Sequence, residues 1–291
     1  MARQRAFVIV AAMEASTPDE TRGTAAQPLT AWWLGRTAYR DAWQLQHRLV
    51  AARVAGLIGD QVLLLEHEPV LTLGRHSDPS HVIAGPAELE NRHIELIRTE
   101  RGGEVTYHGP GQLTAYVIVK LADRGLLIRP LVRALEAGLV GACASLGVEA
   151  APRVGYPGCW CGDGTRKIGA VGVRIEHGVS YHGIALNVTV ALRDFELIDA
   201  CGIPGVVSTS IARELGRASE PTTESVARAA AAFAVALAGA FDAPLDGVLP
   251  PLADPRAARA ELEALLAADA PAASAGPAAS AGPAAPTVAR R

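Results

Sequence analysis

The sequence predicts an α/β (α+β) domain in which a mixed, largely antiparallel sheet is flanked by helices. Apolar, β-branched segments typical of strands alternate with segments whose apolar residues recur at helical spacing. A long pair of strand segments at 165–190 turns at the sequence EHG, which favours antiparallel pairing of chain neighbours. Strands and helices that alternate irregularly in this way are typical of one layered domain.

The elements follow in order along the chain. A helix is predicted at 37–56, where an apolar stripe ends at a glycine, and a buried strand follows at 61–67. Strands at 93–100 and 112–121 lead into and out of a glycine-rich loop. The remaining predicted elements are a helix at 129–147, the hairpin at 165–190, a short helix at 208–216 capped by Ser208, and an Ala-rich helix at 222–241.

Composition divides the chain into three parts. Residues 1–30 are expected to form a flexible N-terminal extension, and residues 31–250 a single folded domain. Residues 251–291 form an Ala/Pro/Gly-rich tail in which AASAGP repeats. Because this tail has few large apolar side chains to bury, we expect it to be disordered.

Charge and hydropathy exclude several classes of protein. The net charge is −3 and the pI is about 6.2, so no strong field would recruit nucleic acid or an anionic membrane. The apolar stretch at 230–241 is too short to cross a bilayer. The apolar run at 6–13 is at the short limit for the apolar region of a signal peptide, and Glu14 follows it directly. We therefore expect a cytoplasmic protein.

Cysteine and lysine usage is informative. The four cysteines form no secreted disulfide pattern, and Cys159 and Cys161 are expected to be ordinary strand or loop residues rather than metal ligands. Among 27 basic residues only Lys120 and Lys167 are lysine. A lysine can act as a base whereas an arginine cannot, so Lys167 is either a residue with a chemical role or a surface lysine that happened to persist, as Lys120 shows can occur.

The loop RGGEVTYHGPGQ, residues 101–112, is the most unusual stretch. It matches neither the Walker nor the dinucleotide-binding spacing. Its glycines would allow a ligand to lie against bare backbone. His108 and His182 occur in the matched contexts TYHG and SYHG, either as residues that line a site or as structural histidines.

Two further residues are candidates for chemistry. Cys201, in DACGIPG, is either a nucleophile held by rigid turns or a structural cysteine. An ammonium such as that of Lys167, at about 4 Å, would favour a thiolate by roughly 4 kcal/mol at an effective dielectric near 20. Such a pair would attack a thioester at neutral pH.

Together these segments resemble the octanoyl-[acyl carrier protein]–protein octanoyltransferases, or lipoyl(octanoyl) transferases, of lipoate synthesis. The resemblance lies in RGGEVTYHGPGQLTAYVIVKL, KIGAVGVRIEHGVSYHGIALNV and ACGIPGVVSTSI, with HEPVLTLGR as an early strand and turn. It covers residues from about 30 to 215 in the family's order. GCWCGDG departs from the family, because cysteines replace the aliphatic residues that more often flank the tryptophan.

The resemblance implies the fold of the biotin and lipoate protein ligase catalytic domain, and a catalytic acyltransferase role for residues 31–250. Cys201 would take an octanoyl group from acyl carrier protein as a thioester, and Lys167 would be the base beside it. The acceptor would be a lysine on the lipoyl domain of a 2-oxoacid dehydrogenase E2 subunit or on the glycine cleavage H protein. No cofactor or metal is implied. The implied acyl-binding positions are Arg101, Gly102, Gly103, Glu104, Val105, Thr106, Tyr107, His108, Ala170, Val171, Gly172, Gly183, Ile184 and Ala185. Thr106, Tyr107 and His108 would shape the reacting end.

Two alternatives remain open at this point. An ATP-dependent lipoate or biotin ligase of the same fold also uses a glycine-rich loop and a lysine, but it needs no nucleophilic cysteine. A non-catalytic module that binds acyl carriers or lipoyl domains would have an ordinary Cys201. Arg153, Arg166 and Arg174 are candidates for contact with an acidic carrier protein, or simply part of a solvated face.

Overall fold

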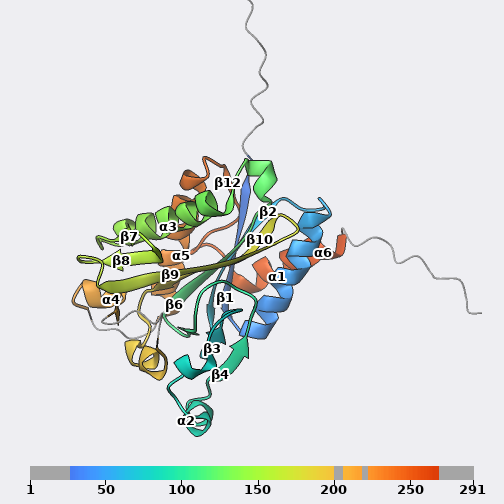
Figure 1. The fold of residues 1–291 in the computed structure, drawn as a ribbon. Coiled ribbons are helices and arrows are strands. Elements are labelled where there is room, and N and C mark those ends of the chain that lie inside the picture. The colour runs from blue at the N-terminus through green and yellow to red at the C-terminus, as the bar shows by residue number, and fades with distance from the viewer. Residues whose placement is uncertain (1–26, 200–205, 218–221, 269–291) are drawn as a thin grey trace, which may run out of the picture.

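A nine-stranded sheet forms the centre of the computed structural model, which describes residues 27–199, 206–217 and 222–268 (Figure 1). The strand order is β12-β1-β2-β6-β10-β9-β8-β7, and β11 pairs with β9. From β2 to β7 all neighbours are antiparallel, whereas β1 runs parallel to both β2 and β12. The strands are β1 (Leu29–Thr37), β2 (Asp60–His67), β6 (Gln112–Ile118), β7 (Ala151–Arg153), β8 (Tyr156–Cys161), β9 (Arg166–Glu176), β10 (Val179–Asn187), β11 (Val207–Ser208) and β12 (Leu245–Asp246).

Helices cover both faces of this sheet. On one face α3 (Ile128–Ser145) and α5 (Thr223–Ala240) pack together over the largest apolar core. On the other face α1 (Tyr39–Val54) and α6 (Pro255–Ala268) enclose a second core, which contains Leu45, Leu63 and Leu262. The apolar residues of β2 alternate between the two cores, so this strand is buried on both faces.

A smaller sheet lies beside the main one and carries the glycine-rich loop. It consists of β3 (Val70–Leu73), β4 (Glu95–Arg98) and β5 (Thr106–His108), in the order β4-β3-β5. The loop leaves β4, crosses the main sheet and re-enters at β5. The remaining elements are α2 (Pro86–Asn91), α4 (Ile211–Glu214) and the 3₁₀ turns Pro79–His81, Leu121–Arg124 and Leu192–Leu197.

The predicted fold class is confirmed: the sheet is mixed and largely antiparallel, with helices on its faces. The cap of the short helix differs from the sequence prediction. The cap of the short helix is Ser210 rather than Ser208, because the Ser210 hydroxyl accepts a hydrogen bond from the Arg213 amide, whereas Ser208 belongs to β11.

The C-terminal tail prediction is wrong for residues 255–268. They form α6, in which Leu262 is fully buried against the second core. The Ala-rich composition suggested disorder, but the leucines of this segment suffice to bind it to the sheet and α1. None of the helices in the described ranges combines the length and apolar character that crossing a bilayer requires.

Candidate active site

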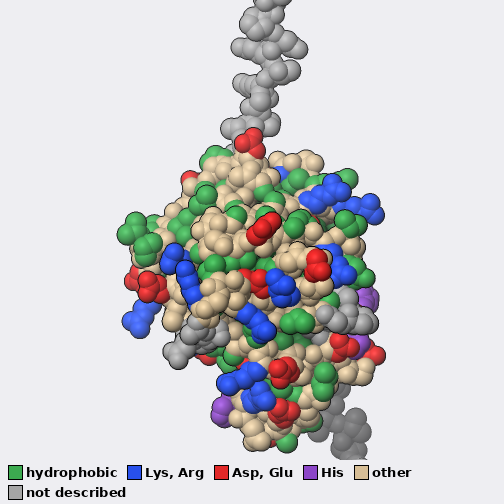
Figure 2. Space-filling view, turned by 90° about the vertical axis from the view of Figure 1, so that its left-hand side faces the viewer, with side chains coloured by type: hydrophobic (Ala, Val, Ile, Leu, Met, Phe, Trp, Pro, Cys, Tyr) green, Lys and Arg blue, Asp and Glu red, His purple; other side chains and the backbone are tan. Residues whose placement is uncertain are grey.

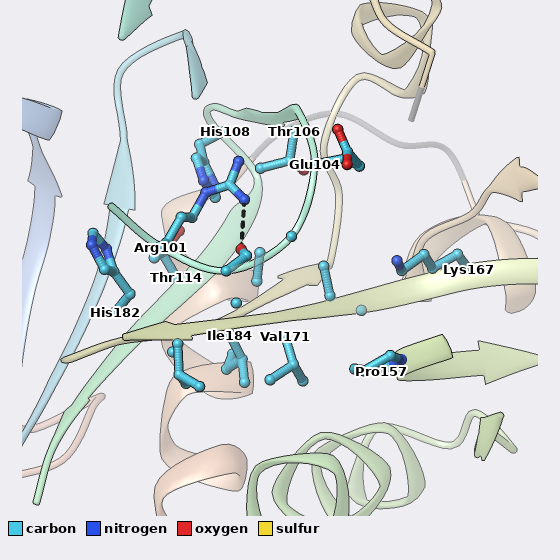
Figure 3. Close-up of a pocket in the computed structure, with 18 of the residues that line it drawn as sticks. Arg101, Glu104, Thr106, His108, Thr114, Pro157, Lys167, Val171, His182 and Ile184 are labelled. Atoms are coloured by element: carbon cyan, nitrogen blue, oxygen red, sulfur yellow. Dashed lines mark hydrogen bonds between the residues drawn. The ribbon is translucent and has the colours of Figure 1, made fainter. Parts of the chain in front are cut away.

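A pocket of about 380 Å³ is lined by the glycine-rich loop and by β6, β10 and β9, and Figure 3 shows the lining residues Val171 and Ile184 on the side of these strands opposite the loop. Figure 3 shows Lys167 at one end of the pocket and Arg101, His108 and His182 at the other. Residues far apart in sequence therefore meet here because the loop is folded back over strands that follow it in the chain.

The floor of the pocket is made of small side chains in register. Ala185 on β10 is paired with Thr114 on β6 and with Ala170 on β9, and Gly183 is paired with Gly172. Directly opposed residues of antiparallel strands share a face, so these residues form a shallow, nearly unbranched surface. Such a floor leaves room for a ligand beneath the loop.

The glycine-rich loop forms the roof of the pocket and contacts the strands of the floor through backbone atoms. The Gly102 amide donates to the Val173 carbonyl at 3.1 Å, so the loop is hydrogen-bonded to β9. A Cβ atom at Gly172 would lie 2.8 Å from the Gly102 carbonyl oxygen. This contact requires a glycine, and it fixes the height of the slot.

Arg101 anchors the loop at the smaller sheet. Its guanidinium donates to the Thr72 carbonyl at 2.6 Å and to the Thr72 hydroxyl at 2.9 Å, and also to the Gly102 carbonyl at 3.0 Å. The side chain is buried, and these hydrogen bonds offset the cost of burying its charge. Glu104 in the same loop pairs with His81 at 3.2 Å.

Lys167 lies at the start of β9, where three strands meet. It is paired with Trp160 on β8 and with Ser208 on β11. Its Nζ lies 5.1 Å from the centroid of the Trp160 ring, and its Cε would touch any side chain placed at Gly158. Arg153 lies over the same ring at 5.1 Å, so the indole is flanked by two cationic side chains.

Two buried histidines, His108 and His182, line the opposite end of the pocket, and His67 lies beside His108. Burial lowers the pKa of His67 to about 4 and lowers those of His108 and His182. His67 donates from Nδ1 to the Thr37 carbonyl, and its Nε2 accepts from the Tyr116 hydroxyl at 2.6 Å. Aromatic contacts join His67, Tyr39 and His108 into one cluster.

Comparison with known proteins identifies the family. The lipoyl protein ligase A/B catalytic domain matches residues 38–234. An octanoyltransferase of Chloroflexus aurantiacus is 47% identical over 191 residues, which are 65% of this chain and 86% of the relative. One of Acidobacterium capsulatum is 44% identical over 209 residues, 68% of this chain and 85% of the relative.

The chain belongs to the octanoyltransferase family.

It is therefore an acyltransferase. Solved structures show the same fold at low sequence identity. Lipoate-protein ligase A bound with ATP aligns with a TM-score of 0.59 and 14% identity, covering 83% of this chain and 93% of that one. A bi-partite lipoate protein ligase from Thermoplasma acidophilum aligns with a TM-score of 0.56 and 15% identity, covering 84% and 91%. These two likenesses establish the fold.

Most residues predicted to bind the acyl group line the pocket, as does the predicted base Lys167. They are Arg101, Gly102, Gly103, Glu104, Val105, Thr106, His108, Ala170, Val171, Gly172, Gly183, Ile184 and Ala185. Tyr107 does not line it. Because β5 alternates its side chains, Tyr107 points into the small core against Phe195.

His108 lies at the end of the pocket away from Lys167, so it does not shape the same end as the lysine. Cys201 lies outside the described residues. The described segments that flank it in the sequence end at Asp199, whose amide donates to the His81 carbonyl, and resume at Val206, which precedes β11.

Sequence reasoning missed several polar residues of the pocket. Among them, Gln112, Thr114 and Asn187 line it and are buried. Each is a lone polar residue in an apolar strand segment, and the strand pairing that brings Gln112 opposite Asn187 is not visible in the sequence. Within the described ranges the Thr114 hydroxyl has no hydrogen-bond partner.

The cysteines of GCWCGDG are buried in β8. Cys159 and Cys161 face the core that α3 covers, and burial raises the pKa of Cys161 to about 12. Since the thiolate is the reactive form, Cys161 is a poor competitor for an acyl group.

Proposed function

We propose that this protein transfers an octanoyl group from octanoyl-acyl carrier protein to the lysine of a lipoyl domain. One observation carries the proposal: Lys167 lies at the end of a slot whose floor is made of small residues and whose roof is glycine backbone. An unbranched chain of eight carbons suits such a slot. Its burial would contribute roughly 0.8 kcal/mol per CH₂.

The reaction runs in two balanced steps. The Cys201 thiolate attacks the acyl carbonyl of the donor thioester, a new C–S bond forms, and the thiol of the carrier protein leaves as a thiolate that takes up a proton. The acceptor lysine then attacks the Cys201 thioester. The C–S bond breaks, an amide forms, and the amine loses a proton to Lys167.

Family membership and the place of Lys167 support this assignment of Cys201. In the sequence, Cys201 precedes β11 by a few residues, and β11 pairs with Arg166 and Lys167. Glycines and small residues of the loop, β9 and β10 would hold the acyl chain. The catalytic domain would comprise residues 31–250 together with α6.

The acceptors would be the lipoyl domains of 2-oxoacid dehydrogenase E2 subunits and the glycine cleavage H protein, in the cytoplasm. Of the arginines predicted to contact the carrier protein, Arg166 is already paired with Glu214, at 2.9 and 3.0 Å. Figure 2 shows acidic and basic side chains interspersed over the face of the molecule on which β7 and β8 lie. We therefore expect donor binding to depend only moderately on salt.

Intact-mass measurement tests the first step. Incubated with octanoyl carrier protein, the protein should gain one octanoyl group that hydroxylamine removes. The Cys201→Ala variant should gain none, whereas the control variant Cys161→Ala should gain one. An octanoyl adduct on Cys201→Ala, or ATP-dependent transfer of free octanoic acid by Cys201→Ser, would refute the mechanism.

Lys167→Arg tests the second residue. It keeps the positive charge but removes the base, so we expect transfer to fall by at least about 100-fold, the lower range for general base catalysis. Lys120→Arg is the matched control, because Lys120 is the other lysine of the chain and does not line the pocket. Near-normal turnover of Lys167→Arg would show that only the charge matters.

A further inference from the structure

A series of hydrogen bonds between buried groups connects the two ends of the pocket. His108 Nδ1 lies 2.7 Å from Gln112 Oε1, and Gln112 Nε2 lies 2.9 Å from Asn187 Oδ1. Asn187 Nδ2 lies 2.9 Å from the Thr209 carbonyl oxygen. The four residues are buried, and they come from β5, β6, β10 and the segment after β11.

The direction of each hydrogen bond in this chain is determined. Gln112 Nε2 also lies 3.1 Å from the Tyr107 carbonyl oxygen, which can only accept, so the nitrogen of the Gln112 amide must be at this end and its oxygen at the other. Because the amide oxygen Oε1 can only accept, His108 must carry its hydrogen on Nδ1. Because burial keeps the His108 ring neutral, Nε2 bears the lone pair. In the described part of the chain Nε2 makes no protein hydrogen bond, and the residue lines the pocket.

At its other end, this series of hydrogen bonds contacts the strand segment that carries Lys167. The Thr209 amide donates to the Lys167 carbonyl at 2.9 Å, while the Thr209 carbonyl accepts from Asn187. The Thr209 hydroxyl donates to Glu214 at 2.6 Å, and Glu214 pairs with Arg166, the neighbour of Lys167. Thr209 is fully buried, so a lost partner would leave an unsatisfied carbonyl.

We propose that Gln112 and Asn187 are positioning residues: they fix His108 with its hydrogen on Nδ1 and its Nε2 turned to the pocket, and they hold the β11–β9 contact that sets the place of Lys167. One hydrogen-bond network would thus position both His108 at the loop end of the pocket and Lys167 at the other end. The kinetic part of this inference rests on the proposed octanoyl transfer, whereas the tautomer does not.

The tautomer is measured by long-range ¹H–¹⁵N NMR of the full chain with ¹⁵N-labelled histidine, at neutral pH. Wild type should show His108 with a protonated Nδ1 and an unprotonated Nε2. Gln112→Met, which has a similar volume but no acceptor, should give a mixture of tautomers. Asn187→Asp keeps the acceptor for Gln112 and should leave His108 unchanged. A protonated Nε2 in the wild type, or a Gln112→Met spectrum like that of the wild type, would overturn the assignment.

Steady-state transfer measures the lysine end. Asn187→Asp loses the donor to Thr209, and we expect kcat to fall by about tenfold or more with little change in KM for the octanoyl donor, since small misplacements of a reacting group are costly. Ser180→Ala is the control for the loss of a buried hydrogen bond on the same strand, because its hydroxyl donates to Val117 away from the pocket. An equal loss of stability in both variants with unchanged kcat would refute the positioning role of Asn187.

The two measurements distinguish a failure of the proposed function from a failure of this inference. If the wild-type protein transfers no octanoyl group, the proposed function is wrong, and the NMR result still decides whether Gln112 fixes His108. If Asn187→Asp does not fold, Asn187→Ser replaces it: the shorter side chain does not reach the Thr209 carbonyl, and the same fall in kcat is expected. Transfer by Asn187→Ser at the wild-type kcat would overturn the inference.

Discussion

Replacing Gly172 by alanine tests whether the slot is closed by a backbone contact. The added Cβ would lie 2.8 Å from the Gly102 carbonyl oxygen, whereas a comfortable C–H···O contact is about 3.3–3.6 Å. The loop must therefore move by about 0.5 Å or more, which strains the hydrogen bond from Gly102 to Val173. Overpacking of this kind costs about 1–3 kcal/mol.

We expect that cost to appear in two assays. Urea unfolding should show a lower free energy of unfolding by about 1–3 kcal/mol. In octanoyl transfer, KM for the donor should rise by about 5- to 30-fold if 1–2 kcal/mol of binding is lost, with a smaller effect on kcat because Lys167 lies at the other end of the pocket.

Gly239→Ala is the matched control. Nothing lies within 4 Å of a Cβ at Gly239, near the end of α5, so alanine there should stabilise the helix by about 0.5–1 kcal/mol and leave transfer unchanged. If Gly172→Ala matched the wild type in both stability and KM, the roof would not rest on the floor as described, and our account of the slot height would be refuted.

Three further predictions address the stability and the site. The pKa of His67 is lowered from 6.5 to about 4, so as the pH falls the unfolded chain binds this proton first. The free energy of unfolding should therefore fall as the pH drops from 6.5 toward 4, by about 2 kcal/mol at pH 5. This pH dependence should weaken in His67→Gln and persist in the control His177→Gln, and a free energy of unfolding that is independent of pH between 7 and 5 would contradict it. Leu262→Ala should destabilise the protein by about 2–5 kcal/mol in urea unfolding, because Leu262 is fully buried; a cost below about 0.5 kcal/mol would show that α6 is dispensable. Trp160→Leu should lower transfer more than Trp160→Phe, which keeps an aromatic ring beside Lys167; equal rates for the two variants would exclude a role for the ring.

The order of helices and strands was largely predictable because the apolar pattern changes period where the structure changes type. The helix predicted at 129–147 is α3, and the hairpin predicted at 165–190 is β9 and β10. Edge elements were less visible. β12 has only two residues, and α6 has a composition that Ala-rich disordered segments share, so only its contacts with the sheet reveal its state.

The lining of the pocket could be predicted where several unusual residues are contiguous, as in the glycine-rich loop. It could not be predicted where residues come together only through strand pairing. Gln112 and Asn187 are 75 positions apart and meet only because β6 and β10 are neighbours in the sheet. Tyr107, which belongs to the same contiguous motif, does not line the pocket, because the alternation of side chains along β5 turns it into the small core.

The small-residue floor bears on how this pocket can be re-engineered. A mutant library designed to accept longer or bulkier acyl groups should not vary the glycine-rich loop, because its main-chain atoms already contact the strands and most substitutions there would disturb its conformation. Thr114, Ala170 and Ala185 form one row across three strands, and each carries a single short side chain. Randomising that row alone would redesign the width of the channel while the scaffold around it stays intact.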